Sequence, residues 1–372
     1  MSTFYVPAIN LIGRGVVNEI GSYVKDLGYN KALLVTDKFI ESSEILPKVT
    51  KPLDEAGIEY VVFSDVEPNP TCKNVTDGVS ALKENNCDFI ISLGGGSPQD
   101  AASCISVIAT NGGKPQDYEG LHKSAKKGLP VVAINTTAGT SAEITINYVI
   151  TDVEKKRKFV CVDPHDIPVV AFVDPDMMSS MPKGLTASTG MDALTHAIEG
   201  YTTKGANTIT DMFNLKAIEL IAQSLRGAVE NTPEGREGMA LGQYLTGMGF
   251  SNCGLGIVHS MAHGLGALYD TPHGVANAII LPTVMEYNKD AVGEKLRAVA
   301  KAMGVADTEK MSKEEYQKAA IDAVKKLAED VGIPKDLKNI VKPEDVDFLS
   351  QSAMDDACRP GNPRDPKLED IQ

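Results

Sequence analysis

The first half of the chain alternates short apolar runs with segments of helical periodicity. Runs that are apolar at nearly every position are typical of parallel strands buried on both faces. Five such runs occur, at residues 31–37, 60–64, 88–93, 129–134 and 167–174. Between them, residues 74–86 and 98–111 carry apolar side chains at helical spacing. This alternation predicts an α/β fold with a doubly wound, Rossmann-like parallel sheet, whose ligand site lies at the carboxyl ends of the strands.

The second half changes to long helical patterns from about Met181 onward. The clearest helical patterns cover residues 210–226, 235–249, 294–303 and 314–331. A chain of 372 residues is long enough for two domains of ordinary size. We therefore expect an α/β domain at residues 1–180 and an all-α domain at residues 181–372.

A glycine-rich loop follows the third apolar run. The run ending at Leu93 continues into Gly94-Gly95-Gly96-Ser97-Pro98, where Ser97 is expected to cap a helix. Glycines at a helix N-terminus let backbone N–H groups approach a pyrophosphate, although a tight turn also needs glycine. A second loop, residues 135–143, adds small hydroxylated residues at the same edge. The two loops together favour a dinucleotide.

Asp37 ends the first strong strand pattern. A carboxylate there accepts hydrogen bonds from a ribose and repels an added 2′-phosphate, which favours NAD over NADP. Aspartate is also a common turn residue, so Asp37 alone is weak evidence.

Histidines gather in the second half with a spacing that indicates a metal site. Asp192 and His196 are four residues apart, as are His259 and His263, and His273 follows at a turn. Four-residue spacing on a helix places two side chains on one face. One carboxylate with several imidazoles suits Fe²⁺ or Zn²⁺ better than Ca²⁺ or Mg²⁺. A lone buried histidine is more often structural, but this set would leave several buried polar groups without partners.

Composition excludes some partners. The net charge of −14 argues against nucleic acid or an anionic membrane as the main partner. The six cysteines show no CxxC spacing, which favours reduced thiols and a cytoplasmic location. No apolar run approaches the roughly 18 residues of a membrane-spanning helix. The basic cluster at residues 155–158 is interpreted as a solvated hairpin.

The sequence resembles the iron-dependent (group III) alcohol dehydrogenases. The segments that carry the resemblance are residues 94–100, 135–143, 158–165, 190–199 and 258–277. The resemblance implies that the metal ligands are Asp192, His196, His259 and His273, with His263 lining the site. It implies that the dinucleotide is contacted by Asp37, Asn69, Gly95, Gly96, Ser97, Asp100, Thr136, Thr137, Thr140 and Lys158. It also implies that Asn147, Phe250 and Cys358 lie near the substrate or the nicotinamide.

The implied reaction is a reversible hydride transfer between NAD and a small alcohol, diol or aldehyde, in a cleft between the domains. The divalent metal acts as a Lewis acid. His263 is a candidate proton relay, and a structural role for it is weighted equally. Nitrogen and oxygen ligands generally bind Zn²⁺ more tightly than Fe²⁺, so the iron assignment rests on the resemblance. A homodimer is expected. Members of the family usually continue into a short final helix, part of which is expected to be missing here.

Three alternatives remain open from the residues. A metal-dependent lyase of the dehydroquinate synthase type needs several cations around its metal. Between Asp192 and His273 the chain has only Lys204, Lys216, Arg226 and Arg236, none beside a ligand motif, which disfavours that class. Glycerol dehydrogenase, normally zinc-dependent, is a nearer rival. A catalytically silent metal- or dinucleotide-binding protein is the third.

Overall fold

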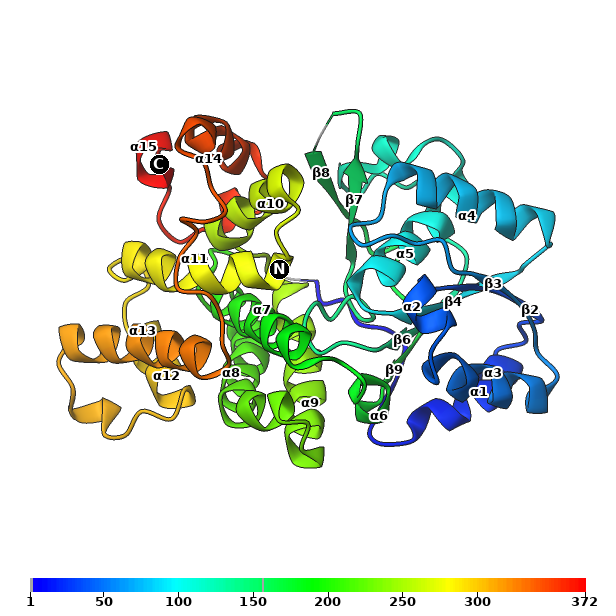
Figure 1. The fold of residues 1–372 in the computed structure, drawn as a ribbon, viewed down its shortest axis with the longest axis horizontal. Coiled ribbons are helices and arrows are strands. Elements are labelled where there is room, and N and C mark those ends of the chain that lie inside the picture. Colours follow the sequence, from blue (N-terminus) through cyan, green and yellow to red (C-terminus); the bar gives the residue numbers. More distant parts are fainter. Residues whose placement is uncertain (1–2, 156) are drawn as a thin grey trace. The chain divides into compact units, whose positions relative to one another are not determined.

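Contacts between Cα atoms divide the chain into two compact units. The computed structural model describes residues 3–155 and 157–372. The N-terminal unit comprises Met1–Thr137 and Ser141–Ser180, and the C-terminal unit comprises Ala138–Thr140 and Met181–Gln372. Figure 1 shows the strands in the first of these units and mainly helices in the second.

The N-terminal unit is built on a parallel six-stranded sheet. Its strands, in spatial order, are β1 (Ile9–Ile12), β9 (Val170–Val173), β6 (Val131–Asn135), β4 (Phe89–Gly94), β2 (Lys31–Val35) and β3 (Glu59–Phe63). The chain passes from β2 outward to β3 and then returns to pair β4 against the other side of β2. The order of the strands therefore reverses between β2 and β4, and ligands of such sheets bind at the carboxyl ends of strands at this reversal.

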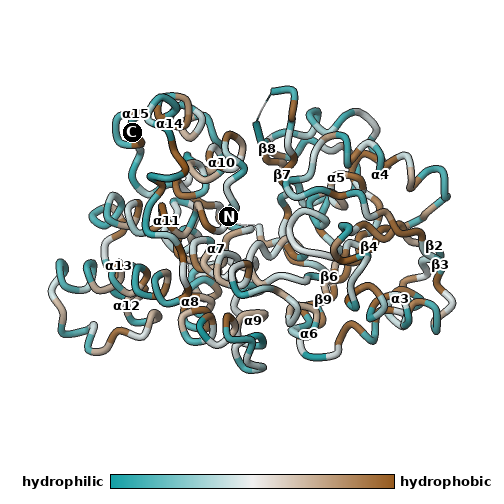
Figure 2. Tube along the Cα trace, in the orientation of Figure 1, coloured by the Kyte–Doolittle hydropathy of each residue, from teal (hydrophilic) through white to brown (hydrophobic). Residues whose placement is uncertain are grey.

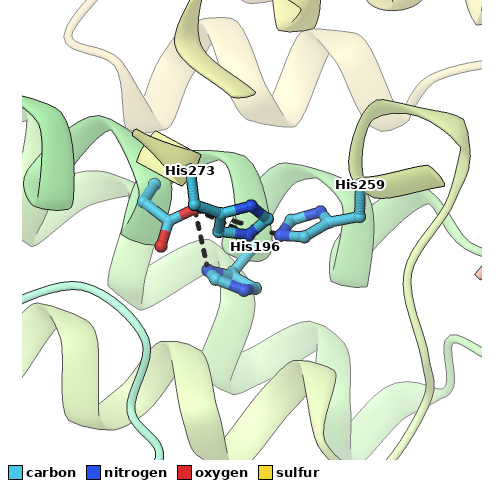
Figure 3. Close-up of side chains that lie close together, drawn as sticks. His196, His259 and His273 are labelled. Carbon is cyan, nitrogen blue, oxygen red and sulfur yellow. Dashed lines mark ion pairs between the residues drawn. The ribbon is translucent and has the colours of Figure 1, made fainter. Parts of the chain in front are cut away.

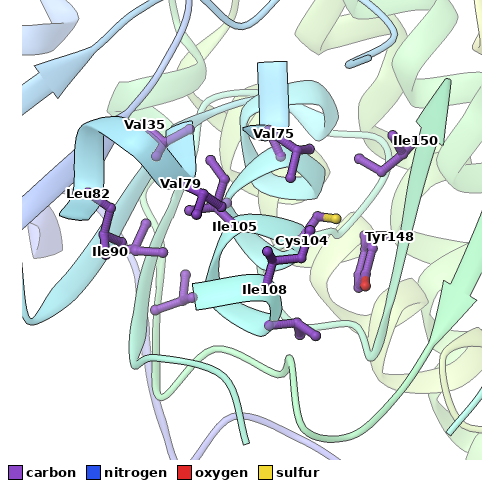
Figure 4. Packing of buried hydrophobic residues seen from close by; sticks show 14 of the residues in the cluster. Val35, Val75, Val79, Leu82, Ile90, Cys104, Ile105, Ile108, Tyr148 and Ile150 are labelled. Carbon is purple, nitrogen blue, oxygen red and sulfur yellow. The ribbon is translucent and has the colours of Figure 1, made fainter. Parts of the chain in front are cut away.

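Helices cover both faces of this sheet. Those of the N-terminal unit are α1 (Ile20–Asp26), α2 (Lys38–Glu41), α3 (Ile45–Ala56), α4 (Cys72–Glu84), α5 (Gly96–Asn111) and α6 (Pro175–Met178), with the 3-10 turns η1 (Val16–Glu19) and η2 (Pro115–Tyr118). One core joins side chains of α4 and α5 to the sheet and is shown in Figure 4. The other core joins α1 and α3 to the opposite face. Burial on both faces explains why β2, β4 and β6 are apolar along their length, as the colouring of Figure 2 shows for β2 and β4.

The five strands expected from apolar runs are confirmed, but the sequence pattern missed others. A small second sheet consists of β5 (Gly120–Leu121), β8 (Arg157–Val162) and β7 (Asn147–Asp152). β7 alternates half-buried and buried residues, and its apolar run covers only residues 148–150. β1 is a half-buried edge strand of four residues. The expected hairpin at 155–158 is present as the antiparallel β7–β8 pair, although Lys156 lies outside the described residues.

The C-terminal unit is helical, as predicted. Its helices are α7 (Lys183–Thr202), α8 (Thr208–Val229), α9 (Pro233–Phe250), α10 (Ile257–Tyr269), α11 (His273–Asn288), α12 (Lys295–Ala302), α13 (Lys313–Asp330), α14 (Val346–Asp355) and α15 (Leu368–Ile371), with the turns η3 (Thr308–Lys310), η4 (Pro343–Asp345) and η5 (Arg359–Gly361). Capping boxes begin α8, at Asn207, and α13, at Ser312. Among the described residues, none of the helices is long and apolar enough to cross a membrane.

Helix α7 lies at the centre of the C-terminal unit. It packs against α8, α9 and α11, and its residues from Thr186 to Tyr201 are buried with the single exception of Thr189. A helix that is buried all round places any polar side chain it carries inside the protein core. Asp192 and His196 therefore occupy a position where polar groups need partners.

Candidate active site

Three helices bring four potential metal ligands together. Asp192 and His196 lie one turn apart on α7, His259 is on α10, and His273 is the first residue of α11 (Figure 3). Gly274 explains how α11 comes so near, because a Cβ atom on it would lie 2.2 Å from the backbone oxygen of Ser188 on α7. The close backbone approach that only glycine allows carries His273 to Asp192.

The distances within this cluster fit one divalent ion. Oδ1 of Asp192 lies 3.9 Å from Nδ1 of His196, 4.0 Å from Nε2 of His259 and 3.7 Å from Nε2 of His273. One ligand atom from each residue lies within 4.8 Å of all the others. An ion with bonds of about 2.1 Å joins two atoms up to about 4.2 Å apart, and the three distances from Oδ1 of Asp192 lie within that limit. The buried Nδ1 of His196 has no hydrogen-bond partner among the described residues, which an ion would satisfy.

Burial keeps the imidazoles in the form that binds metal. It lowers the pKa of His196 below the ordinary value for histidine. Burial, together with the neighbouring histidines, lowers the pKa of His259 far below that value. Neutral imidazoles offer a lone pair, whereas imidazolium does not, so this pocket favours ligation over protonation.

Glu199 is a functional candidate that the sequence reasoning missed. It lies on α7, and its Oε1 accepts from the backbone N–H of Val258 at 2.8 Å, while Nδ1 of His259 donates to its Oε2 at 2.5 Å. Glu199 thus caps the start of α10, which has no side-chain cap of its own. It also keeps the proton of His259 on Nδ1, so that Nε2 is unprotonated, as a metal ligand must be. Its position three residues after His196 places it on the same helix face, but that spacing alone does not reveal its partners on α10.

Asn277 is the second candidate that was missed. It lies one turn after His273, and its amide nitrogen lies 2.6 Å from Oδ1 of Asp192, 3.1 Å from Nε2 of His273 and 3.2 Å from Nε2 of His259. The side chain is fully buried, and its Oδ1 has no hydrogen-bond partner in the described chain. Asn277 therefore orients the carboxylate of Asp192 from inside the cluster.

Other predicted residues of the C-terminal unit lie beside these ligands. The ring of Phe250 stacks on that of His196 with centroids 4.3 Å apart. The ring of His263 lies 6.2 Å from that of His259 and 5.5 Å from that of His273. Cys358 offers its sulfur within 4.8 Å of ligand atoms of His263 and Asp356.

The glycine loop lies at the reversal point of the sheet, and its helix starts earlier than expected. Gly95 is the N-cap of α5, so the expectation that Ser97 caps this helix was wrong. Because Gly94 has a φ of +153° and completes β4, the chain turns before it reaches Ser97. A Cβ atom on Gly95 would lie 2.8 Å from Cγ2 of Thr137. Glycine keeps the backbone N–H groups at the start of α5 accessible, which suits a bound phosphate.

Asp37 follows β2 beside this loop. The hydroxyl of the preceding Thr36 donates to the backbone oxygen of Leu93 at 2.8 Å, which joins the ends of β2 and β4. The Oδ1 atom of Asp37 accepts from the backbone N–H of Ile40 at 2.8 Å and caps α2. Asp37 can therefore be both a local cap and an acceptor for a ribose, because the cap uses only one of its two carboxylate oxygens.

Asn69 links further predicted dinucleotide residues. Its backbone N–H donates to Oγ of Ser97 at 3.3 Å, and Nζ of Lys158 donates to its Oδ1 at 2.7 Å. Burial raises the pKa of Asp100, on α5, to about 8, although the nearby Lys158 acts in the opposite direction. These four residues form one connected group in the N-terminal unit.

The remaining predicted residues divide between the units. Thr136 and Thr137 directly follow β6, where the N–H of Thr136 donates to the backbone oxygen of Gly94 at 3.1 Å. Asn147 begins β7. Thr140, in contrast, belongs to the three-residue segment that groups with the C-terminal unit.

Comparisons with known proteins agree with this arrangement. Residues 7–175 match the family "Iron-containing alcohol dehydrogenase", and residues 186–372 match the "Fe-containing alcohol dehydrogenase family, C-terminal". The chain is 54% identical to lactaldehyde reductase of Escherichia coli K12 over 362 residues, which cover 96% of this chain and 94% of that protein.

Solved structures give the same result. A crystal structure of 1,3-propanediol oxidoreductase superposes with a TM-score of 0.97 at 42% identity, covering 100% of this chain and 98% of the other. The sulfoacetaldehyde reductase of Bifidobacterium kashiwanohense, solved in complex with NAD⁺, gives a TM-score of 0.89 at 29% identity, covering 100% and 96%.

Proposed function

Because the chain belongs to the iron-containing alcohol dehydrogenase family, we propose that it interconverts lactaldehyde and 1,2-propanediol, using NAD(H) and Fe²⁺ as cofactors. The observation that carries this proposal is the cluster of one carboxylate and three imidazoles, all buried except the half-buried His273, in a chain similar over nearly its whole length to a lactaldehyde reductase. Zn²⁺ is the alternative ion, since the donor atoms suit both metals.

In this proposal, Asp192, His196, His259 and His273 hold the ion. When bound, a divalent ion supplies a Lewis acid for the negative charge that develops on the substrate oxygen. Glu199 and Asn277 fix the direction of the ligand atoms, as their hydrogen bonds indicate. Phe250 covers one face of His196 with an apolar ring, which limits access of water.

The N-terminal unit is proposed to hold the dinucleotide. The backbone N–H groups at the start of α5 bind the pyrophosphate, and Asp37 accepts hydrogen bonds from the ribose. The proposed contacts of this unit are completed by Asn69, Ser97, Asp100, Thr136, Thr137, Asn147 and Lys158. The contact expected of Thr140, which groups with the C-terminal unit, stays a prediction. NAD rather than NADP is supported by the carboxylate of Asp37, and a related enzyme has been solved with NAD⁺.

Anaerobic enzymology tests the proposal. Protein loaded with Fe²⁺ should oxidise NADH when lactaldehyde is added and should reduce NAD⁺ when 1,2-propanediol is added. A parallel assay with 1,3-propanediol distinguishes the activity of a lactaldehyde reductase from that of a 1,3-propanediol dehydrogenase, since the chain is similar to both. Elemental analysis of protein purified without oxygen identifies the ion. Lack of turnover with every small alcohol and aldehyde would exclude the activity.

A pair of variants tests the metal ligands. His196→Ala should lose the bound ion, because it removes a buried ligand on the central helix. His122→Ala is the matched control, since His122 is exposed on a loop. Equal metal content in the two variants would contradict the assignment of His196. The homodimer and the cytoplasmic location expected from the sequence stay predictions, which gel filtration and cell fractionation address.

A further inference from the structure

The first turn of helix α10 is held by two side chains that are remote in the sequence. α10 has no side-chain cap of its own. The backbone N–H of Ile257, its first residue, donates to Oδ1 of Asn362 at 3.4 Å, and that of Val258 donates to Oε1 of Glu199 at 2.8 Å. Buried N–H groups at a helix N-terminus need acceptors, because an unpaired one is destabilising. The place where α10 begins therefore depends on Asn362 as well as on Glu199.

The side-chain amide of Asn362 uses all of its hydrogen-bonding groups. The residue is only 1% exposed. Its amide pairs reciprocally with that of Asn288, since Nδ2 of each donates to Oδ1 of the other at 2.9 Å. Nδ2 of Asn362 also donates to the backbone oxygen of Arg364 at 2.6 Å, while Oδ1 also accepts from Ile257. An amide offers two N–H donors and two lone pairs on its oxygen, so no group is left over.

The pair of asparagines connects α10 with α11, and the two helices pack against each other. Asn288 is the last residue of α11 and is also buried, and the same helix begins with the potential metal ligand His273. The potential ligand His259 lies two residues after Ile257, in the first turn of α10. Asn362 therefore contacts both helices, at the first turn of one and at the last turn of the other.

The residue before Asn362 contacts the end of α7. The backbone oxygen of Gly361 accepts from the N–H of Lys204 and from Oγ1 of Thr203, the C-cap of α7, both at 2.8 Å. A Cβ atom on Gly361 would lie 2.2 Å from the backbone oxygen of Leu255, so only glycine lets the turn come this near to the segment before α10. This one C-terminal turn thus contacts α7, α10 and α11, the three helices that carry the potential metal ligands.

We propose that Asn362 is a positioning residue for the metal site, which holds the first turn of α10 against the end of α11 and so presents His259 at a fixed separation from the ligands of the other two helices. This inference rests on the proposed metal-dependent activity. Ligands that are already in place lose little conformational freedom when the ion binds, so the ion binds more tightly. Asn362 acts through α10 and does not touch the ion.

A purely stabilising role is the alternative for the same contacts. Hydrogen bonds between buried amides stabilise a fold wherever they occur, so a loss of stability does not separate the two roles. The roles differ in what the folded protein does. Positioning predicts a weaker and differently arranged metal site at temperatures at which the protein is folded, whereas a purely stabilising role predicts an unchanged site.

The substitution Asn362→Leu tests the proposal, because leucine has a similar volume and forms none of these hydrogen bonds. Asn288→Ala is a milder variant, which removes the link to α11 and leaves the other two hydrogen bonds of Asn362 in place. Gln317→Met is the matched control. Gln317, on α13, is also a buried amide, and its Nε2 donates to the backbone oxygen of Lys289, the C-cap of α11, at 2.9 Å. That hydrogen bond reaches the end of α11 without involving α10.

Competition with a chromophoric chelator measures the affinity of each folded protein for Zn²⁺. We expect the Kd to rise about tenfold or more in Asn362→Leu, by a smaller factor in Asn288→Ala, and to stay unchanged in Gln317→Met. Bound Co²⁺ gives visible d–d bands that depend on the arrangement of its ligands. These bands should shift in Asn362→Leu and match the wild type in Gln317→Met. Thermal unfolding of the metal-free proteins shows which of them are folded at the temperature of the assay.

Unchanged Zn²⁺ affinity and Co²⁺ bands in Asn362→Leu and Asn288→Ala overturn the proposal. An equal loss of affinity in Gln317→Met also overturns it, because the effect then follows stability. If Asn362→Leu does not fold, the comparison of Asn288→Ala with the control decides. These measurements need no turnover. A wild type that binds one ion but oxidises no alcohol refutes the proposed function and leaves this inference standing, whereas a wild type that binds no divalent ion refutes both.

Discussion

The substitution Glu199→Gln tests how the protein prepares His259 to bind a metal ion. The two oxygens of Glu199 have different donors: Oε1 accepts from the N–H of Val258 at 2.8 Å, and Oε2 accepts from Nδ1 of His259 at 2.5 Å. Glutamine offers one oxygen and one NH₂ group in the same space. In either orientation of the amide, its oxygen accepts from one of the two donors, while its NH₂ group, itself a donor, faces the other.

Both orientations have a cost that follows from the geometry. If NH₂ faces Val258, a buried backbone N–H loses its acceptor, which costs about 1–3 kcal/mol of folding stability. If NH₂ faces His259, the ring proton moves to Nε2, the atom 4.0 Å from Oδ1 of Asp192. That proton blocks the ligand position. Removing a carboxylate that orients a ligating histidine typically lowers metal affinity 10- to 100-fold, or about 1.4 to 2.7 kcal/mol.

Competition with a chromophoric chelator, under anaerobic conditions for Fe²⁺ and in air for Zn²⁺, measures this loss. Glu219→Gln serves as the control, because Glu219 is half-exposed on α8 and pairs only with Lys216. The thermal unfolding temperature of both metal-free variants separates lost affinity from lost stability. A metal affinity of Glu199→Gln equal to that of the control would refute the role given to Glu199.

Three further outcomes are expected. Asp37→Ser keeps an N-cap for α2 but removes the negative charge. The kcat/KM for NADP, divided by the kcat/KM for NAD, should therefore rise at least tenfold. An unchanged ratio would show that Asp37 does not contact the ribose. Gly95→Ala places a methyl group 2.8 Å from Cγ2 of Thr137. Titration with NADH, followed by fluorescence, should therefore show weaker binding than in the wild type. Equal binding would show that the glycine loop does not contact the dinucleotide. Burial, then the charge of Asp163, raises the pKa of Asp166 well above its ordinary value. The contribution of Asp166 to the free energy of unfolding should therefore fall as pH rises above about 4, by up to about 1.4 kcal/mol per unit. Chemical denaturation should show that the wild type loses stability relative to Asp166→Asn over this range, and a constant difference would contradict the assignment.

The pattern of apolar residues was sufficient for the main sheet and for the helical unit. β2, β4 and β6 are buried on both faces, so their sequences are apolar throughout and easily identified. β7 and β8 belong to a separate small sheet, in which buried residues alternate with half-buried ones, so they lack the burial on both faces that marks the strands of the main sheet. The start of α5 was misplaced because the conformation of Gly94, and not the side chain of Ser97, decides where the chain turns.

The four potential metal ligands could be proposed from spacing, but their supporting residues could not. The four-residue spacing of Asp192 and His196 in the sequence already indicates that both lie on one face of a helix. Glu199 and Asn277 gain their roles only when α10 and α11 pack against α7, and no local pattern encodes that packing. Asn362 is 74 residues from Asn288 along the chain, a separation at which a single sequence gives no pairing signal.

The ligands lie on three helices, α7, α10 and α11, so a bound ion would hold these helices together in addition to its role in catalysis. Without it, a carboxylate and three imidazoles, of which that of His273 is half-buried, face one another around the amide nitrogen of Asn277. Amide protons in the first turns of α10 and α11 should then exchange with deuterium faster than those of the sheet. A cell short of iron would consequently accumulate molecules that are open to proteases in the helical half first.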